Sequence, residues 1–273
     1  MLAHALAVED NHLFGHARYM THPMEFTNPP VRRLAARALD ILLPPACVAC
    51  GRLVSRAHAL CGPCWEKVDF IDDPKCQCCG RPFDSDPGRH SHCGPCLRNP
   101  PIYERARSAI VYGDHSRRFI LAYKHGDRTD MVPAMTGWLE RAGEGLIADA
   151  DVIAPVPLHW SRFLTRRFNQ SAELARILAR RSDVPFAPDL LSRKKRTVSQ
   201  AGLNAKQRAR NVRGAFSVKP AWLNGLSGQR VLLVDDVLTT GATLNACAGI
   251  LLWAGARAVD VLTVARVVRA ERD

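Results

Sequence analysis

Residues 231–243 read VLLVDDVLTTGAT, and this stretch decides the fold. Its first four residues are apolar, which is typical of a strand buried on both faces of a sheet. Two acidic residues, Asp235 and Asp236, follow where that strand is expected to end. A loop of small residues comes next, and an apolar helical pattern then runs from Leu244 to Trp253. The stretch therefore predicts a strand, an acidic tip, a tight turn and the start of a helix.

The turn has the composition of a phosphate-binding loop. Its residues are Thr239, Thr240, Gly241, Ala242 and Thr243. Hydroxyl groups and backbone N–H groups at the positive end of a helix dipole bind phosphate well, and the two acidic residues are then expected to take sugar hydroxyls. The loop lacks the Gly-Lys-Ser/Thr triplet of a Walker A motif. The stretch resembles the phosphoribosyl-pyrophosphate (PRPP) motif of type I phosphoribosyltransferases; the alternative is an ordinary strand–helix unit whose acidic residues cap the helix.

Length and charge limit the class of protein. The 273 residues have room for one good-sized domain and a smaller module, and the formal net charge is +12. No apolar run reaches the length of about 18 residues that a membrane-spanning helix needs, and the N-terminus lacks the pattern of a secretory signal. We therefore expect a cytoplasmic protein with no membrane span.

The N-terminal part is expected to contain two segments. Residues 1–28 carry four histidines and no clear periodicity, which favours a disordered leader over a metal-binding tail. Met20 and Met24 are alternative starts of the chain. Residues 29–43 are expected to form an amphipathic helix that packs on the rest of the protein, with binding to a membrane surface as the alternative.

Cysteines dominate residues 44–99. Nine of the ten cysteines lie there, and eight of them form four CxxC knuckles. The knuckle residues are Cys47, Cys50, Cys61, Cys64, Cys76, Cys79, Cys93 and Cys96. Two such pairs supply four thiolates to a tetrahedral Zn²⁺, so the spacing predicts two structural zinc sites in a double zinc ribbon. Disulfides and an iron–sulfur cluster are the alternatives, and Cys78, His90 and His92 compete as ligands of the second site.

Residues 100–268 alternate between strand and helix patterns. Strands are expected at 107–112, 151–156, 229–236 and 258–265, and helices at 119–124, 131–146, 242–254 and from Thr165 or Asn169 to Arg181. This alternation predicts a parallel sheet covered on both faces, with the ligand at the carboxyl ends of the strands.

Two further segments are expected to contact the ligand. Val156 and Pro157 fix a loop at a strand end, and a basic and polar stretch follows them. Together with Lys124, the candidates there are Arg162, Asn169 and Gln170. The second segment is polar, basic and glycine-containing, and it is expected to close over the site as a lid that excludes water. Its candidate residues are Arg196, Gln200, Arg208 and Asn211.

The order of these motifs resembles the ComF family, the competence protein F-like phosphoribosyltransferases. The resemblance rests on the four cysteine knuckles, the element KHGD at 124–127, the stretch APVPLHWSRFLTRRFNQSAELA at 154–175, the stretch RTVSQAGLNAKQRARNVRGAF at 196–216, and the opening motif. It implies a double zinc ribbon followed by a type I phosphoribosyltransferase fold, which is a twisted, mostly parallel sheet with helices on both faces. It also implies that Asp235 and Asp236 hold the ribose hydroxyls and that residues 239–243 hold the 5′-phosphate. Some members of the family act in natural DNA uptake, and the acceptor base is generally not established.

The expected function is Mg²⁺-dependent binding of PRPP by a phosphoribosyltransferase-like protein that is linked to DNA uptake. The sequence does not identify the acceptor substrate. No recognisable base-binding pocket follows the last strand, so no catalytic residue is assigned. The alternative is a non-catalytic protein that binds single-stranded DNA, or DNA-uptake proteins, through the ribbons and the basic loop. Ten basic and no acidic residues between Asp189 and Asp235 suit either polyanion, and the sequence leaves the oligomeric state open.

Overall fold

The computed structural model describes residues 44–88, 91–125, 128–158, 169–194, 205–212 and 214–268. The chain from Pro44 to Asp273 forms one compact unit. The predicted leader at 1–28, the predicted helix at 29–43 and the candidates Arg162, Arg196 and Gln200 lie outside the described residues. No helix within the described part of the chain is long and apolar enough to cross a membrane.

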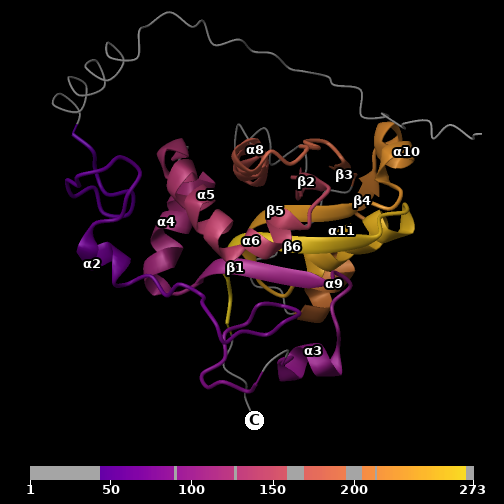
Figure 1. Ribbon diagram of the computed structural model, residues 1–273, viewed down its shortest axis with the longest axis horizontal. Helices are drawn as coiled ribbons and strands as arrows, with labels where there is room; N and C mark the ends of the chain where they lie inside the picture. Colours follow the sequence, from indigo (N-terminus) through magenta and orange to yellow (C-terminus); the bar gives the residue numbers. More distant parts are fainter. Residues whose placement is uncertain are drawn as a thin grey trace, which may run out of the picture. The chain divides into compact units, whose positions relative to one another are not determined.

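A four-stranded parallel sheet organises the larger part of the unit. Its strand order is β1-β6-β5-β2, as Figure 1 shows. The strands are β1 (Arg105–Val111), β2 (Val152–Pro155), β5 (Arg230–Leu238) and β6 (Ala258–Arg266). All nine residues of β6 are buried, as expected for a central strand covered on both faces. The predicted parallel sheet is confirmed.

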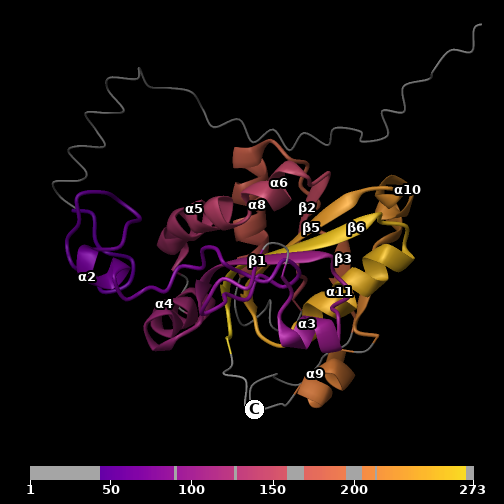
Figure 2. The same ribbon diagram turned by 60° about the horizontal axis from the view of Figure 1, so that its bottom comes forward.

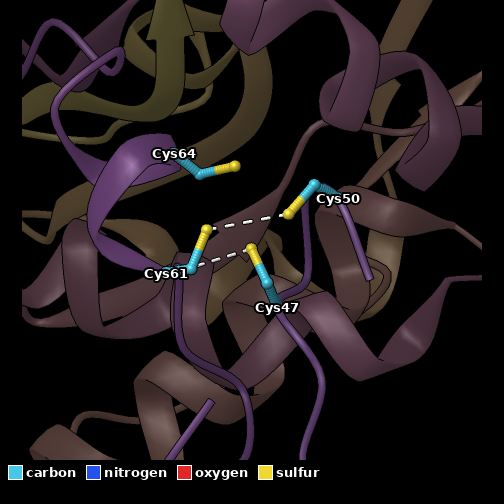
Figure 3. A group of neighbouring side chains, drawn as sticks. All are labelled: Cys47, Cys50, Cys61 and Cys64. Atoms are coloured by element: carbon cyan, nitrogen blue, oxygen red, sulfur yellow. Dashed lines mark hydrogen bonds between the residues drawn. The ribbon is translucent and has the colours of Figure 1, made fainter. Parts of the chain in front are cut away.

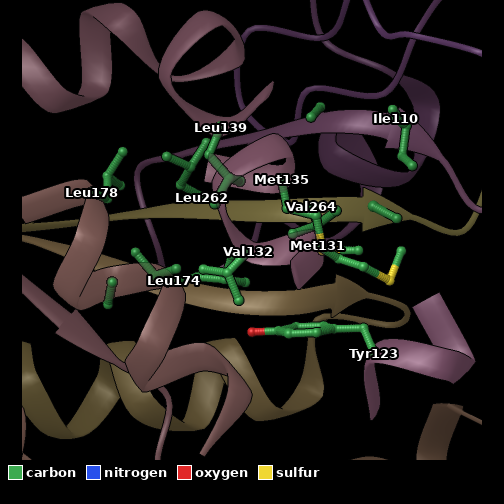
Figure 4. Packing of buried hydrophobic residues seen from close by; sticks show 14 of the residues in the cluster. Ile110, Tyr123, Met131, Val132, Met135, Leu139, Leu174, Leu178, Leu262 and Val264 are labelled. Carbon is green, nitrogen blue, oxygen red and sulfur yellow. The ribbon is translucent and has the colours of Figure 1, made fainter. Parts of the chain in front are cut away.

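One face of the sheet is covered by three helices, α4 (Asp114–His125), α5 (Val132–Ala142) and α8 (Gln170–Ser182). Their apolar residues form a continuous core with the sheet, in which Met131, Met135, Leu139 and Leu174 are fully buried (Figure 4). The hydroxyl of Tyr123 points from α4 toward α8 and donates to the carbonyl of Gln170 at 2.7 Å. This contact joins the end of α4 to the start of α8, and both ends lie close to the candidate site.

The opposite face is covered by α11 (Ala242–Trp253), which packs on β6 and on α9 (Ala205–Val212), as Figure 2 shows. A short antiparallel pair, β3 (Leu191–Arg193) and β4 (Phe216–Val218), flanks this layer. Cys247 is fully buried within α11, where it packs as a small apolar group. The remaining short elements are η1 (Thr129–Met131), α6 (Glu144–Ala148), η2 (Pro220–Trp222) and α10 (Leu223–Leu226).

The cysteine-rich part contains two copies of one local structure. Each copy begins with a knuckle that turns at a glycine in the left-handed region, Gly51 with φ +76° and Gly80 with φ +68°. Each continues to a short helix that starts at a Cys-Gly-Pro-Cys sequence, α2 (Gly62–Trp65) and α3 (Gly94–Arg98). Equivalent hydrogen bonds close the two knuckles, from Cys47 N to Arg52 O and from Cys76 N to Arg81 O. The module is therefore a duplicated ribbon.

Several features differ from the sequence-based expectations. The helix expected at 119–124 begins earlier, at Asp114. The helix expected over 131–146 ends at Ala142, because Gly143 interrupts it before α6 begins. The strand expected to end at Asp236 continues to Leu238, so both acidic residues lie inside β5, and Asp235 is opposite Thr263 of β6. The β3–β4 pair was not predicted, since three-residue strands are too short to show an alternating pattern.

Candidate functional site

The acidic pair of β5 lies in a network of hydrogen bonds and one ion pair. The Ser171 hydroxyl donates to Asp235 Oδ1 at 2.8 Å, and the backbone N–H of Asp236 donates to the same oxygen at 2.9 Å. Lys124 Nζ pairs with Asp236 Oδ2 at 3.1 Å, and both side chains are largely enclosed. Residues from α4, α8 and β5 thus meet at the carboxyl end of the central strands.

The carboxyl group of Asp235 has a raised pKa. Burial and, to a smaller extent, the negative charge of the neighbouring Asp236 raise the pKa of this carboxyl from 3.8 to about 7. The hydrogen bond from Ser171 acts in the opposite direction, because it favours the ionised form. A carboxyl group that titrates near neutral pH at the end of a strand is typical of a functional site.

Gln170 and Asn169, both predicted to contact the ligand, form hydrogen bonds that hold the backbone near the acidic pair in place. Gln170 Nε2 donates to the carbonyl of Lys124 at 3.1 Å, which holds the end of α4 against α8. Asn169 caps α8 by accepting from Ser171 N at 3.1 Å, and its amide nitrogen donates to Val156 O at 3.2 Å. These two side chains position Lys124 and Ser171 around the acidic pair.

The loop after β5 has the geometry of an anion-binding turn. Gly241 adopts φ +73°, a conformation that favours glycine, and it precedes the first residue of α11. Thr240 Oγ1 is buried and has no hydrogen-bond partner among the described residues. A buried hydroxyl without a partner is costly, so this one is ready to bond a ligand oxygen. Thr239 is exposed, and Ala242 and Thr243 are partly exposed.

The other predicted residues are placed as follows. Val156 is buried directly after β2, where its N–H donates to Val234 O, and Pro157 is partly exposed next to it. Of the lid candidates, Arg208 and Asn211 lie in α9. Ser171 was not among the predicted site residues. Its hydroxyl in the first turn of α8, directly after two candidate polar residues, was the available signal.

The first cysteine tetrad consists of Cys47, Cys50, Cys61 and Cys64, whose sulfur atoms lie within 4.8 Å of one another. The four side chains converge on one point (Figure 3), and Cys50 Sγ and Cys61 Sγ are 3.6 Å apart. Zn–S bonds of about 2.3 Å in a tetrahedron separate the sulfurs by about 3.8 Å, so this spacing fits Zn²⁺. Cys50 is exposed, and Cys64 is partly exposed.

The second tetrad consists of Cys76, Cys79, Cys93 and Cys96, and all four residues are buried. Cys79 Sγ and Cys93 Sγ are 3.6 Å apart. Among the described residues, neither Cys78 nor His92 belongs to this group, and His90 lies outside them. The predicted ligand set of the second site is therefore the set that the fold brings together.

In each tetrad, backbone N–H groups favour the thiolate form of one cysteine. Hydrogen bonds from the Cys79 thiol and from backbone N–H groups lower the pKa of Cys76 to about 4. Burial opposes the ionisation of Cys47, yet the backbone N–H groups of Cys61 and Cys50 lower its pKa to about 6. Thiolates are the form that binds Zn²⁺, so the donor chemistry fits this metal at both tetrads.

The two metal sites are expected to release zinc at different rates. Cys50 of the first tetrad is exposed, whereas every ligand of the second is buried, so a chelator has easier access to the first site. The fully loaded chain should contain two zinc ions and lose them to a chromophoric chelator in two phases. A stoichiometry near one, or a single phase of release that Cys50→Ser does not alter, would contradict this expectation.

Two domain families match this chain. A model of the double zinc ribbon domain matches residues 38–97, and a model of the phosphoribosyl transferase domain matches residues 169–272. Competence protein F of Haemophilus influenzae is 30% identical over 81% of this chain and 96% of its own length. The chain belongs to the competence protein F (ComF) family. Within that family, DNA utilization protein YhgH of Escherichia coli K12 is also 30% identical, over 84% of this chain and the whole of that one.

More distant similarities are consistent with this family. Competence protein ComFC of Bacillus subtilis is 27% identical over 78% of this chain and 87% of its own length. Among solved structures, an adenine phosphoribosyltransferase from Thermoanaerobacter pseudethanolicus is 19% identical, covering 52% of this chain and 83% of that one with a TM-score of 0.33. With a TM-score this low, the assignment of the fold depends on the family models and on the sheet.

Proposed function

We propose that the chain binds PRPP together with Mg²⁺ at the carboxyl end of β5 and transfers its phosphoribosyl group to an acceptor. The observation that carries this proposal is the cluster of Asp235, Asp236, Lys124 and Ser171 directly before a glycine-turned loop at the start of α11. Carboxylates suit ribose hydroxyls, and the loop suits the phosphate. The phosphoribosyltransferase-like domain and the names of the relatives support the same function in a context of DNA uptake or use.

Each part of the cluster has a task in this proposal. Phosphoribosyl transfer passes through a positively charged ribose while pyrophosphate leaves, so the site must hold the ribose, neutralise the pyrophosphate and exclude water. Asp235 and Asp236 accept the ribose hydroxyls, and Thr240 donates to the 5′-phosphate. In this proposal, binding of the leaving pyrophosphate is assigned to Lys124, Arg162 and the lid residues Arg196, Gln200, Arg208 and Asn211. When bound, Mg²⁺ supplies positive charge to the pyrophosphate oxygens.

Lys124 connects these tasks. It is paired with Asp236 in the structure, and the binding of ribose hydroxyls to Asp236 would free its ammonium group for the pyrophosphate. The carbonyl contact from Gln170 fixes the backbone of Lys124 while the side chain moves.

Calorimetric titration with Mg²⁺-PRPP tests the proposal. The wild-type chain should bind, binding should weaken without Mg²⁺, and a variant with both Asp235→Ala and Asp236→Ala should give no heat. Asp149→Asn is the matched control, since this exposed carboxylate pairs with Arg105 and lies far along the sheet from β5's acidic residues. No heat with the wild-type chain would refute PRPP binding.

A second function, the binding of single-stranded DNA by the ribbons and the basic loop, is favoured by the names of the relatives, which refer to competence and DNA utilization. Such binding depends steeply on salt concentration. If the double variant keeps a salt-dependent affinity for single-stranded DNA while PRPP gives no heat with the wild-type chain, this second function replaces the first.

A further inference from the structure

Arg266, the last residue of β6, is a buried cation beside the second tetrad. Only 7% of the residue is exposed. Its guanidinium donates to the carbonyl oxygen of Cys79 and, at 3.6 Å, to Cys79 Sγ. Its Nε is buried without a partner, and no carboxylate of the described residues forms an ion pair with it. A buried charge is costly unless an opposite charge compensates it. Among the described residues, the cysteines beside the guanidinium are the groups that can supply the compensating charge.

A metal-loaded second tetrad provides this compensation. Four thiolates and one Zn²⁺ carry a net negative charge, whereas four neutral thiols or two disulfides carry none. The first tetrad has no equivalent arrangement among the described residues. Arg128, which contacts that knuckle, donates to the Val48 carbonyl at 3.1 Å and takes its counter-charge from Asp130 at 2.8 Å.

Arg266 also lies beside the phosphate loop. It is opposite Leu238 in the register of β5 and β6, and the N–H of Val267 donates to Leu238 O at 2.9 Å. The residue directly after the end of β5 is Thr239, the first of the loop. A shift of Arg266 can therefore displace the loop through the hydrogen bond between Val267 and Leu238.

The segment that follows the second ribbon also contacts the loop and the start of α11. Tyr103 is buried, and its hydroxyl oxygen lies 3.7 Å from the position that a Cβ of Gly241 would occupy. The N–H of Ile102 donates to Asn245 Oδ1 at 2.8 Å, in the first turn of α11. The second ribbon is thus linked to the loop in two ways: through Tyr103 in the segment that follows the ribbon, and through Arg266, whose partner in β5 is Leu238, the residue before the loop.

We propose that Arg266 is a positioning residue that neutralises the zinc tetrathiolate of the second ribbon and thereby fixes the loop at residues 239–243. Metal in the second tetrad and order in the loop then stabilise one another, and the first tetrad takes no part. The contact of Arg266 with the metal site stands independently of PRPP binding; only the effect of ligand on the metal rests on the proposed function.

Zinc release and hydrogen exchange of the full-length, zinc-loaded chain test this proposal. The informative variant is Arg266→Met, which removes the charge, and the matched control is Arg257→Met, which breaks an exposed ion pair with Asp151 just before β6. Loss of a group that supports a metal ligand lowers metal affinity by about 10–100-fold. We expect Arg266→Met to accelerate one phase of release about tenfold or more, to leave the other unchanged, and to increase amide exchange at residues 238–246.

The phases are assigned with Cys50→Ser, which retains only the second site. If Arg266→Met does not fold, Arg266→Lys replaces it. We expect this variant to release zinc faster from the second site, because lysine keeps the positive charge but lacks the several N–H donors of the guanidinium group. Wild-type release rates in the folded Arg266 variant, or unchanged exchange in the loop, would overturn the proposal.

Ligand effects separate this proposal from the proposed function. Mg²⁺-PRPP should slow release from the second site of the wild-type chain, since coupling between two sites is reciprocal. Calorimetric binding of PRPP without any effect on release overturns the coupling and leaves the proposed function intact. Absence of binding refutes the proposed function, and the exchange of the ligand-free loop in Arg266→Met still decides the role of Arg266.

Discussion

Asp235→Asn is expected to stabilise the ligand-free protein at pH 8 and to weaken PRPP binding. Burial and the charge of Asp236 raise the pKa of Asp235 from 3.8 to about 7. The folded chain holds the proton of Asp235 more tightly than the unfolded chain does. The stabilising contribution of the protonated carboxyl to the free energy of unfolding is therefore complete below about pH 4 and is lost as the pH rises through 7. At pH 8 the ionised carboxyl costs on the order of 2–4 kcal/mol, and a neutral asparagine removes this cost.

The substitution also preserves the local contacts. The oxygen Oδ1 that accepts from Ser171 and from the Asp236 backbone has an equivalent in asparagine. The lost carboxylate oxygen is the one available to a ribose hydroxyl, so binding should weaken by about 10–100-fold, as for a hydrogen bond to a charged group.

Denaturant unfolding between pH 5 and 8 measures this effect. The free energy of unfolding of the wild-type chain should fall relative to that of Asp235→Asn as the pH rises. Asp72→Asn is the control, because its exposed ion pair with Arg141 should contribute no more than about 1 kcal/mol. Asp236→Asn should act in the opposite direction and destabilise by about 1–3 kcal/mol, since it leaves the enclosed ammonium of Lys124 unpaired. Parallel pH curves for wild type and Asp235→Asn would refute the expectation.

How much of this site the sequence predicts depends on how far apart in the chain the interacting residues lie. The apolar run before Asp235 and the small residues after it are local signals, and they placed β5, the loop and α11 close to their observed bounds. Lys124 was also identified, although its pairing with Asp236 connects elements far apart in the chain. Ser171 was missed because a serine in the first turn of a helix usually has a local role.

Arg266 shows a different limit. In the sequence it is one charge at the end of an apolar strand, and such a charge is normally solvated. Only the fold brings the second ribbon against this strand and encloses the guanidinium beside Cys79. Spacing predicted which cysteines form each tetrad, but it could not show that the two tetrads have different surroundings, because those surroundings come from β1 and β6.

Cys76→Ser is expected to destabilise the chain far more than Cys50→Ser, although each removes one zinc ligand. Cys76 is fully buried and its sulfur accepts from the Cys93 N–H at 3.3 Å. The second ribbon is also joined to the sheet, because the N–H of Ala106 in β1 donates to Cys78 O at 2.6 Å. Loss of its metal should therefore disturb the edge of the sheet as well as the ribbon, and binding of zinc contributes directly to folding.

The first ribbon differs in the exposure of its metal ligands and in its contacts with the larger domain, which include His58 Nδ1 at 2.6 Å from Asp130 O. Cys50 is exposed, and the described contacts of this ribbon with the larger domain include Val48 in the core and the donation from Arg128 to its carbonyl. Both variants should contain one zinc ion per chain. Cys76→Ser should unfold at least about 10 °C below the wild type, whereas Cys50→Ser should lose about half as much or less, since a ΔΔG of 1 kcal/mol shifts the midpoint by about 2–4 °C in a chain of this size. Equal losses of thermal stability would show that the contacts of the second ribbon with β1 and β6 add nothing to the contribution of its metal.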